Sequence, residues 1–167
     1  GFCAARVMDM PVPGQNDAAE GLAKAEAFWK RWSGDPLIVP AVGPHAAYTV
    51  GPETLMRAKA LADRYKAPLA IHAAEGPSEM AMVKEKYGVS TIHHFDRIGF
   101  LGPNVTLAHA IWLSDAEIAL IAKAGAGTAH RPSSNTKLAT GVSPVPKLRR
   151  AGVRAGLAEI GPGLIGL

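Results

Sequence analysis

Short apolar runs alternate with amphipathic stretches along this chain of 167 residues. Six of these runs are almost continuously apolar, which is typical of strands that are covered on both faces of a sheet. They fall at residues 2–8, 37–42, 69–72, 105–109, 126–130 and 153–157. Cys3 lies inside the first run, so we expect it to be a buried, inert thiol.

Five stretches between the runs are predicted to be helical. Two of them begin with capping-box spacing, Asp17 to Glu20 and Ser114 to Glu117, in which the first side chain accepts from a backbone N–H three residues on. Others are bounded by a proline in the first turn or a glycine after the last. The predicted helices span residues 17–32, 53–65, 78–87, 114–125 and 144–150. Strands that alternate with such helices indicate parallel β-α-β units.

The length limits how far this pattern can extend. A chain of 17.4 kDa supports one core, so we expect a single domain over residues 1–167. A complete (β/α)8 barrel needs about 250 residues. The sequence therefore predicts an α/β fold, an incomplete (β/α)8 TIM-type barrel of about six parallel strands with flanking helices. Its two outer strands would expose unpaired backbone, so we expect a homo-oligomer, or a sheet whose edges are capped by the chain's own termini.

Composition excludes several classes of protein. With 48% hydrophobic and 19% charged residues the chain is not disordered, and a single cysteine excludes a disulfide framework. No apolar run reaches the ~18 residues of a membrane span, and no signal peptide is visible, so we expect a cytoplasmic protein. The net charge is +4. The only compact basic group belongs to the end of a predicted helix, where the helix dipole favours cations, so no nucleic-acid partner is expected.

Histidines mark the carboxyl ends of the predicted strands. His45 follows the second strand closely, and His72, His109 and His130 end three others. The carboxyl ends of parallel strands form the active face of such folds, so the sequence predicts a functional site there. Of the other two histidines, the pair at 93–94, we expect only a surface or helix-capping role before a short helix.

Five strings around these histidines resemble one known family. They are G-P-H-A-A-Y-T from Gly43, I-H-A-A-E from Ile71, L-A-H-A-I-W-L from Leu107, A-H-R-P-S-S-N-T-K-L-A-T-G from Ala129 and P-V-P-K-L-R-R-A-G-V from Pro144. In order and spacing they resemble the amidohydrolase superfamily, particularly the deaminases of 5′-methylthioadenosine and S-adenosylhomocysteine and their triazine-hydrolase relatives. The resemblance implies a (β/α)8 barrel with zinc, or sometimes iron, at its C-terminal face. There a metal-activated water attacks a small amidine or aminopurine substrate and ammonia leaves.

The resemblance also implies roles for individual residues. His72 looks like the metal ligand of the family's fifth strand, and Glu75 like the carboxylate that shuttles protons between water and substrate. His109 looks like the histidine that polarises or hydrogen-bonds the substrate. A neutral imidazole is a good zinc ligand, and zinc lowers the pKa of a bound water to about 7.

Further residues are implied on the substrate side of the site. His45 looks like a substrate-contact histidine, and His130, Ser134 and Asn135 look like residues of the loop after the family's seventh strand. Trp112 lies three residues past His109 in the sequence, and we expect it to border a bound ligand.

Three of the family's four metal-ligand positions are not matched. The family's first strand carries a His-x-His pair, and no such pair occurs in this chain. The position of the aspartate in the family's last strand is taken by Ile160. Glu159, one residue earlier, would point to the other face unless a bulge intervened. Since zinc needs at least three protein ligands, His72 alone would not hold it tightly.

Three hypotheses therefore stay open. The chain is a truncated or diverged hydrolase of this family that has become a metal-free ligand-binding or structural protein. Alternatively, it assembles with another chain and rebuilds a metal site from His45, His72, His109 and His130. In the third, it hydrolyses or binds a different small molecule at the same face.

Overall fold

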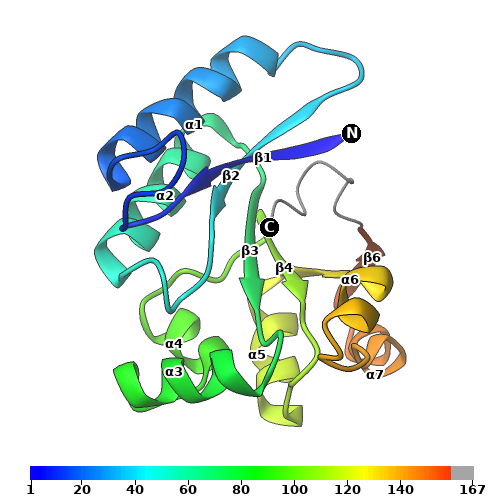
Figure 1. Cartoon of the computed structure of the whole chain (residues 1–167). Helices are drawn as coiled ribbons and strands as arrows, with labels where there is room; N and C mark the ends of the chain where they lie inside the picture. The colour runs from blue at the N-terminus through cyan, green and yellow to red at the C-terminus, as the bar shows by residue number, and fades with distance from the viewer. Residues whose placement is uncertain (159–167) are drawn as a thin grey trace.

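The computed structural model describes residues 1–158, which form one parallel six-stranded sheet (Figure 1). Every strand pairs with its neighbours in sequence, so the spatial order equals the chain order. The strands are β1 (Phe2–Val7), β2 (Val39–Pro44), β3 (Leu69–Ala73), β4 (Val105–His109), β5 (Gly127–His130) and β6 (Arg154–Leu157). The prediction of six parallel strands in an α/β fold is confirmed.

Seven helices occur among the described residues. They are α1 (Ala18–Trp32), α2 (Pro52–Tyr65), α3 (Pro77–Tyr87), α4 (Thr91–Arg97), α5 (Asp115–Ala124), α6 (Pro132–Lys137) and α7 (Val145–Arg150). All five predicted helices are present. The short helix expected after the histidine pair is α4, which begins earlier, at Thr91, and contains the pair. The helix α6 was missed because its one proline and five polar residues carry no apolar periodicity. None of the helices in this part of the chain is both long and apolar enough to cross a membrane.

The predicted caps explain where the helices begin. At α5, the Ser114 side chain accepts from the Glu117 backbone, and Glu117 Oε2 accepts from the Ser114 backbone N–H at 2.7 Å. At α1, Asp17 Oδ1 accepts from Glu20 N at 2.8 Å. Each cap satisfies backbone donors that have no partner inside the helix. The starts of both helices are therefore encoded locally.

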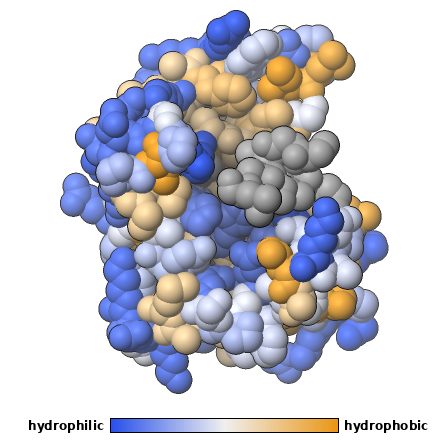
Figure 2. Space-filling view, in the orientation of Figure 1, coloured by the Kyte–Doolittle hydropathy of each residue, from blue (hydrophilic) through white to orange (hydrophobic). Residues whose placement is uncertain are grey.

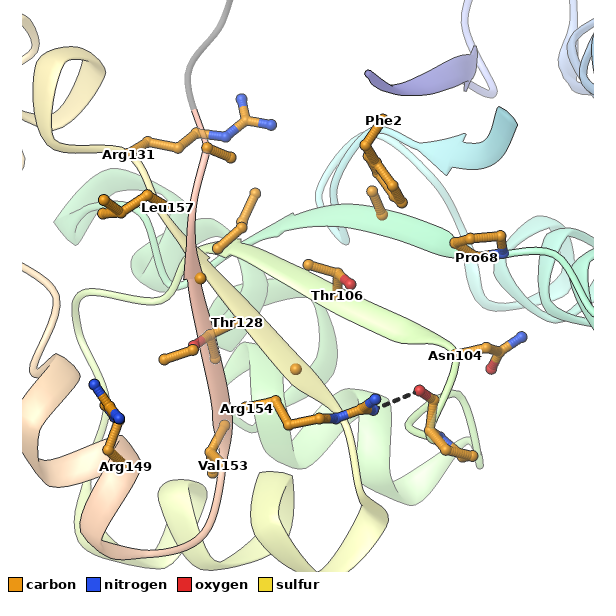
Figure 3. Close-up of a pocket in the computed structure, with 18 of the residues that line it drawn as sticks. Phe2, Pro68, Asn104, Thr106, Thr128, Arg131, Arg149, Val153, Arg154 and Leu157 are labelled. Carbon is orange, nitrogen blue, oxygen red and sulfur yellow. Dashed lines mark hydrogen bonds between the residues drawn. The ribbon is translucent and has the colours of Figure 1, made fainter. Parts of the chain in front are cut away.

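The core lies between the helices and one face of the sheet. Leu69 and Ile71 on β3 are fully buried, as is Leu107 on β4. Side chains alternate between faces along a strand, so Ala70 and Thr106 point the other way. These two are only partly buried and line an open pocket of about 960 Å³ on the opposite face, shown in Figure 3.

The expectation that both faces of the strands are covered is therefore wrong for the outer strands. Phe2 on β1 is 50% exposed and Leu157 on β6 is 80% exposed. Cys3 is also exposed, which corrects its expected burial. An apolar run predicts a strand, but β1 and β6 each have a partner on one side only among the described residues.

The paired histidines also differ from the prediction. His93 is exposed, and its Nδ1 lies 2.9 Å from Ser90 Oγ. His94 is buried and stacks on Tyr87, with ring centroids 3.8 Å apart. The surface assignment is therefore wrong for His94. In the sequence, neighbouring residues of one helix give no sign of which side packs inward when the helix has only two turns.

We predict that Leu107→Ala lowers the free energy of unfolding by about 2–5 kcal/mol, because it leaves a cavity in the core. Urea denaturation of wild type and variant measures this difference. Val142→Ala is the control, since Val142 is 78% exposed and its truncation should change stability by less than about 0.5 kcal/mol. Equal stabilities of the two variants would contradict the placement of Leu107.

Candidate active site

The carboxyl ends of β2, β3 and β4 surround a pocket of about 630 Å³. Figure 2 shows hydrophilic residues on the floor of the hollow at the centre of the molecule. The polar and charged residues that line the pocket are Arg6, His45, His72, Glu75, His109, Arg131 and Ser134. Five of these are predicted site residues, so the strand-end pattern in the sequence corresponds to one place in the structure.

His72, Glu75 and His109 converge most closely. His109 Nε2 lies 3.1 Å from His72 Nδ1 and 3.5 Å from Glu75 Oε1. One potential ligand atom from each of the three residues lies within 4.8 Å of the others. His109 is buried, and the Glu75 side chain keeps 24% of its surface exposed. The structure thus joins the three residues that the resemblance placed at the centre of the chemistry.

The backbone is strained where these side chains are presented. His109 and Ala110 have φ angles of 70° and 49°, and Ala74 has a φ of 51°. Left-handed backbone costs a residue with a side chain about 1–3 kcal/mol. Hydrogen bonds hold the strained segment in place, since Ala110 N donates to Ala73 O at 3.0 Å and Ile111 N donates to Ala74 O at 2.9 Å.

Glu79 supports the same turn and was missed by the sequence analysis. Its buried carboxylate accepts from the backbone N–H groups of Ala74 at 3.1 Å and Glu75 at 2.7 Å, and from Thr91 Oγ1 at 2.8 Å. Burial raises the pKa of Glu79, while these hydrogen bonds oppose the rise. In the sequence, the only indication of this role was that Glu79 is an acidic residue four positions after Glu75.

His45 contributes from the end of β2. Its ring centroid lies 5.1 Å from that of His72 in an edge-on arrangement. Thr49 Oγ1 donates to Ala46 O at 3.2 Å and lies 2.8 Å from His45 Nδ1, so its oxygen is free to accept the Nδ1 proton. That arrangement leaves the other ring nitrogen of His45 without its proton.

Asn135 contacts the ring nitrogen of His109 that lies away from His72, and His130 lies next to Asn135. Asn135 is buried on α6, and its Oδ1 lies 2.7 Å from His109 Nδ1. Its Nδ2 lies 3.5 Å from His130 Nδ1. These two residues do not line the pocket themselves but contact a residue that does.

Trp112 lies apart from this group. It is 46% exposed, its Nε1 donates to Thr140 O at 2.8 Å, and it is absent from the pocket lining. Arg131, which the sequence analysis did not select, does line the pocket. Its position directly after His130 was the only signal. The candidate ligand Glu159, and Ile160 at the family's aspartate position, lie outside the described residues.

Burial keeps the central histidines neutral. The pKa of His72 is lowered to about 3, chiefly by burial and then by the neighbouring His109, His45 and Arg131 in that order. Burial also lowers the pKa of His109, although the contacts with Asn135 and Glu75 oppose the change. Neutral imidazole is the form that binds metal ions.

The donor set fits a zinc ion. His72, Glu75 and His109 each bring one potential ligand atom within 4.8 Å of the others. Two imidazoles and one carboxylate also match a donor set that catalytic zinc uses.

We predict a specific pH dependence of stability for the metal-free protein. Because the pKa of folded His72 is about 3 and that of an unfolded histidine about 6.5, protons favour the unfolded chain between these values. The stability contribution is fully present above about pH 6.5 and falls as the pH drops towards 3. From pH 7 to 5, wild type should lose about 1–2 kcal/mol more than His72→Asn in urea denaturation. Parallel losses in the two proteins would contradict the burial of a neutral His72.

Comparisons with known proteins give the chain its family. The model of the amidohydrolase family matches residues 2–159. A 5-methylthioadenosine/S-adenosylhomocysteine deaminase from Syntrophobacter fumaroxidans is 39% identical over 153 residues, which are 92% of this chain and 35% of that protein. A 5′-deoxyadenosine deaminase from Methanothrix thermoacetophila is 40% identical over 142 residues, 85% of this chain and 34% of that protein. The chain thus spans about a third of the length of these relatives.

Solved structures agree with the sequence relatives. An adenosine deaminase from Xanthomonas campestris with bound zinc superimposes with a TM-score of 0.88 at 34% identity, over 94% of this chain and 36% of that one. An atrazine chlorohydrolase from Arthrobacter aurescens complexed with zinc reaches a TM-score of 0.83 at 22% identity, over 96% of this chain and 38% of that one, which supports the fold alone. The six-stranded sheet is accordingly an incomplete barrel of this type, and the chain belongs to the amidohydrolase family.

Proposed function

We propose that this chain carries a metal-dependent hydrolytic site that releases ammonia from an aminopurine nucleoside or a similar C–N compound. The observation that carries the proposal is the convergence of His72, Glu75 and His109 at the strand ends, where each offers one potential ligand atom within 4.8 Å of the others. The names of the relatives, which are deaminases of adenosine-type compounds, support this substrate class.

Each residue has a distinct task in this proposal. His72 would hold the metal, with nitrogen and oxygen donors of His109 and Glu75 within reach. A bound zinc would supply Lewis acidity and a water that loses its proton near neutral pH. Glu75 takes that proton, because its carboxylate is partly exposed to the pocket, and returns it to the substrate.

The reaction is balanced by one water molecule. Its oxygen bonds to the amidine carbon, the bond from that carbon to the amino nitrogen breaks, and the two protons of the water accompany the product and the departing ammonia. His45 and Ser134 line the same pocket and are placed to contact the substrate. Burial lowers the pKa of His109 and so keeps this histidine neutral.

The competing function is that of a ligand-binding or structural protein without metal. A pocket of about 630 Å³ is large enough for a small organic ligand. Metal content separates the two functions.

We predict that the purified chain binds zinc near one ion per molecule and releases ammonia from 5′-methylthioadenosine. His72→Ala should lose both properties, because it removes a central donor. His93→Ala is the matched control, since His93 is an exposed histidine outside the pocket. Elemental analysis and an ammonia assay make the measurements. A folded wild type without zinc or ammonia release would support the ligand-binding alternative.

We predict that Glu75→Gln keeps the zinc and lowers the rate of ammonia release by about 10²–10⁴-fold, because it removes the proton carrier. The same two assays test this outcome. A loss of zinc as large as that of His72→Ala would instead assign the carboxylate to the metal.

We also propose that copies of the chain associate through the edge of β1 that has no partner strand among residues 1–158, where Phe2 is 50% exposed. We predict a mass of at least two chains in light scattering. Ala4→Lys should shift the protein to one chain, because lysine on an edge strand blocks pairing. Val142→Lys, in an exposed loop, should not. Wild type that remains one chain at high concentration would refute the association.

A further inference from the structure

A row of four side chains passes from the pocket into the protein. His72 Nδ1 lies 3.1 Å from His109 Nε2, and His109 Nδ1 lies 2.7 Å from Asn135 Oδ1. The row ends where Asn135 Nδ2 lies 3.5 Å from His130 Nδ1. We propose that Asn135 is a positioning residue that fixes the proton positions, or tautomers, of all three histidines.

The carboxamide is the only member of the row with fixed polarity. Its oxygen accepts and its nitrogen donates, whereas a neutral imidazole can carry its proton on either nitrogen. The contact between Asn135 Oδ1 and His109 Nδ1 therefore requires the proton to be on Nδ1. The Nε2 of His109 then carries a lone pair and faces the pocket as an acceptor.

The proton position of His109 in turn determines that of His72. Since His109 Nε2 accepts, His72 must donate from Nδ1 across the 3.1 Å contact. A neutral His72 with its proton on Nδ1 has a lone pair on Nε2. On the other side, Asn135 Nδ2 donates to His130 Nδ1, which leaves the proton of His130 on Nε2.

The amide is held firmly enough to impose this order. Asn135 is 1% exposed, and its backbone N–H donates to Arg131 O at 2.9 Å within α6. Its carbonyl oxygen accepts from the backbone N–H of Thr140 at 3.0 Å and from Thr140 Oγ1 at 3.4 Å. Hydrogen bonds to the residues before and after α6 thus fix the backbone N–H and C=O of Asn135.

The consequence for the site rests on the proposed function, but the tautomers do not. With their protons on Nδ1, His72 and His109 carry no proton on Nε2 before any metal arrives, and the Nε2 of His72 is the one that no other member of the row contacts. A buried acceptor that takes the second ring proton of a ligand histidine sets the ring for binding, and loss of such a group typically weakens metal affinity 10–100-fold. Asn135 would perform this role through His109.

The test is the ¹⁵N spectrum of the histidine rings in metal-free protein at about pH 8, above the ordinary histidine pKa of about 6.5. Long-range ¹H–¹⁵N correlations show which ring nitrogen carries the proton, and single His→Gln variants assign the signals. We expect His72 and His109 with the proton on Nδ1 and His130 with the proton on Nε2. Nε2 protons on His72 and His109 would show the opposite polarity and overturn the inference.

Two variants of Asn135 separate its two ends. Asn135→Asp keeps an acceptor for His109 but removes the donor to His130, so only His130 should lose its fixed tautomer. Asn135→Leu removes both ends, and all three rings should show mixed tautomers. Lys137→Ala, exposed on the same helix, is the control and should leave all rings unchanged. Unchanged tautomers in Asn135→Leu would refute the role, and if that variant does not fold, wild type and Asn135→Asp decide.

A zinc titration against a competing chelator adds a second readout. Asn135→Leu should bind zinc 10–100-fold more weakly than Lys137→Ala. If no variant binds zinc, the proposed function fails while the ring spectra still test the tautomers. If zinc binds and the spectra show the opposite polarity, the proposed function survives and this inference fails.

Discussion

The pairing of β3 with β4 is the constraint on which the site depends. The two strands match residue for residue from Leu69 with Val105 to Ala73 with His109. This register places the ends of both strands at one level, so that their histidine rings meet above the sheet. Alternation turns His72 away from the helix-covered face that buries Ile71, whereas His109, two residues after the buried Leu107, reaches the pocket through its left-handed backbone.

Beyond the ends of the strands, buried polar side chains position the residues of the site. Glu79 holds the turn that carries Glu75, and Asn135 holds the ring of His109. Each is almost fully buried and each satisfies donors or acceptors that would otherwise be left without partners. The strained backbone at Ala74 and His109 persists because these hydrogen bonds over-determine it.

Much of this arrangement could be predicted from the sequence. Apolar runs located all six strands, and local caps such as Ser114 located the helix starts, because both signals are short in range. The histidines at the strand ends followed from the same runs. The exposure of Cys3, the burial of His94 and the contribution of Glu79 could not be predicted, because they depend on which elements pack against them. The helix α6 was not predicted because hydrogen bonds of polar side chains, and not an apolar stripe, stabilise it.

The exposure of Cys3 has a practical consequence. It is the only thiol in the chain, and it lies on the wall of the pocket that contains His72 and His109. A fluorophore or spin label attached there would be a single reporter whose environment changes whenever the pocket fills. The same thiol offers an anchor from which weakly binding fragments can be captured covalently and ranked by how far they reach towards the histidines.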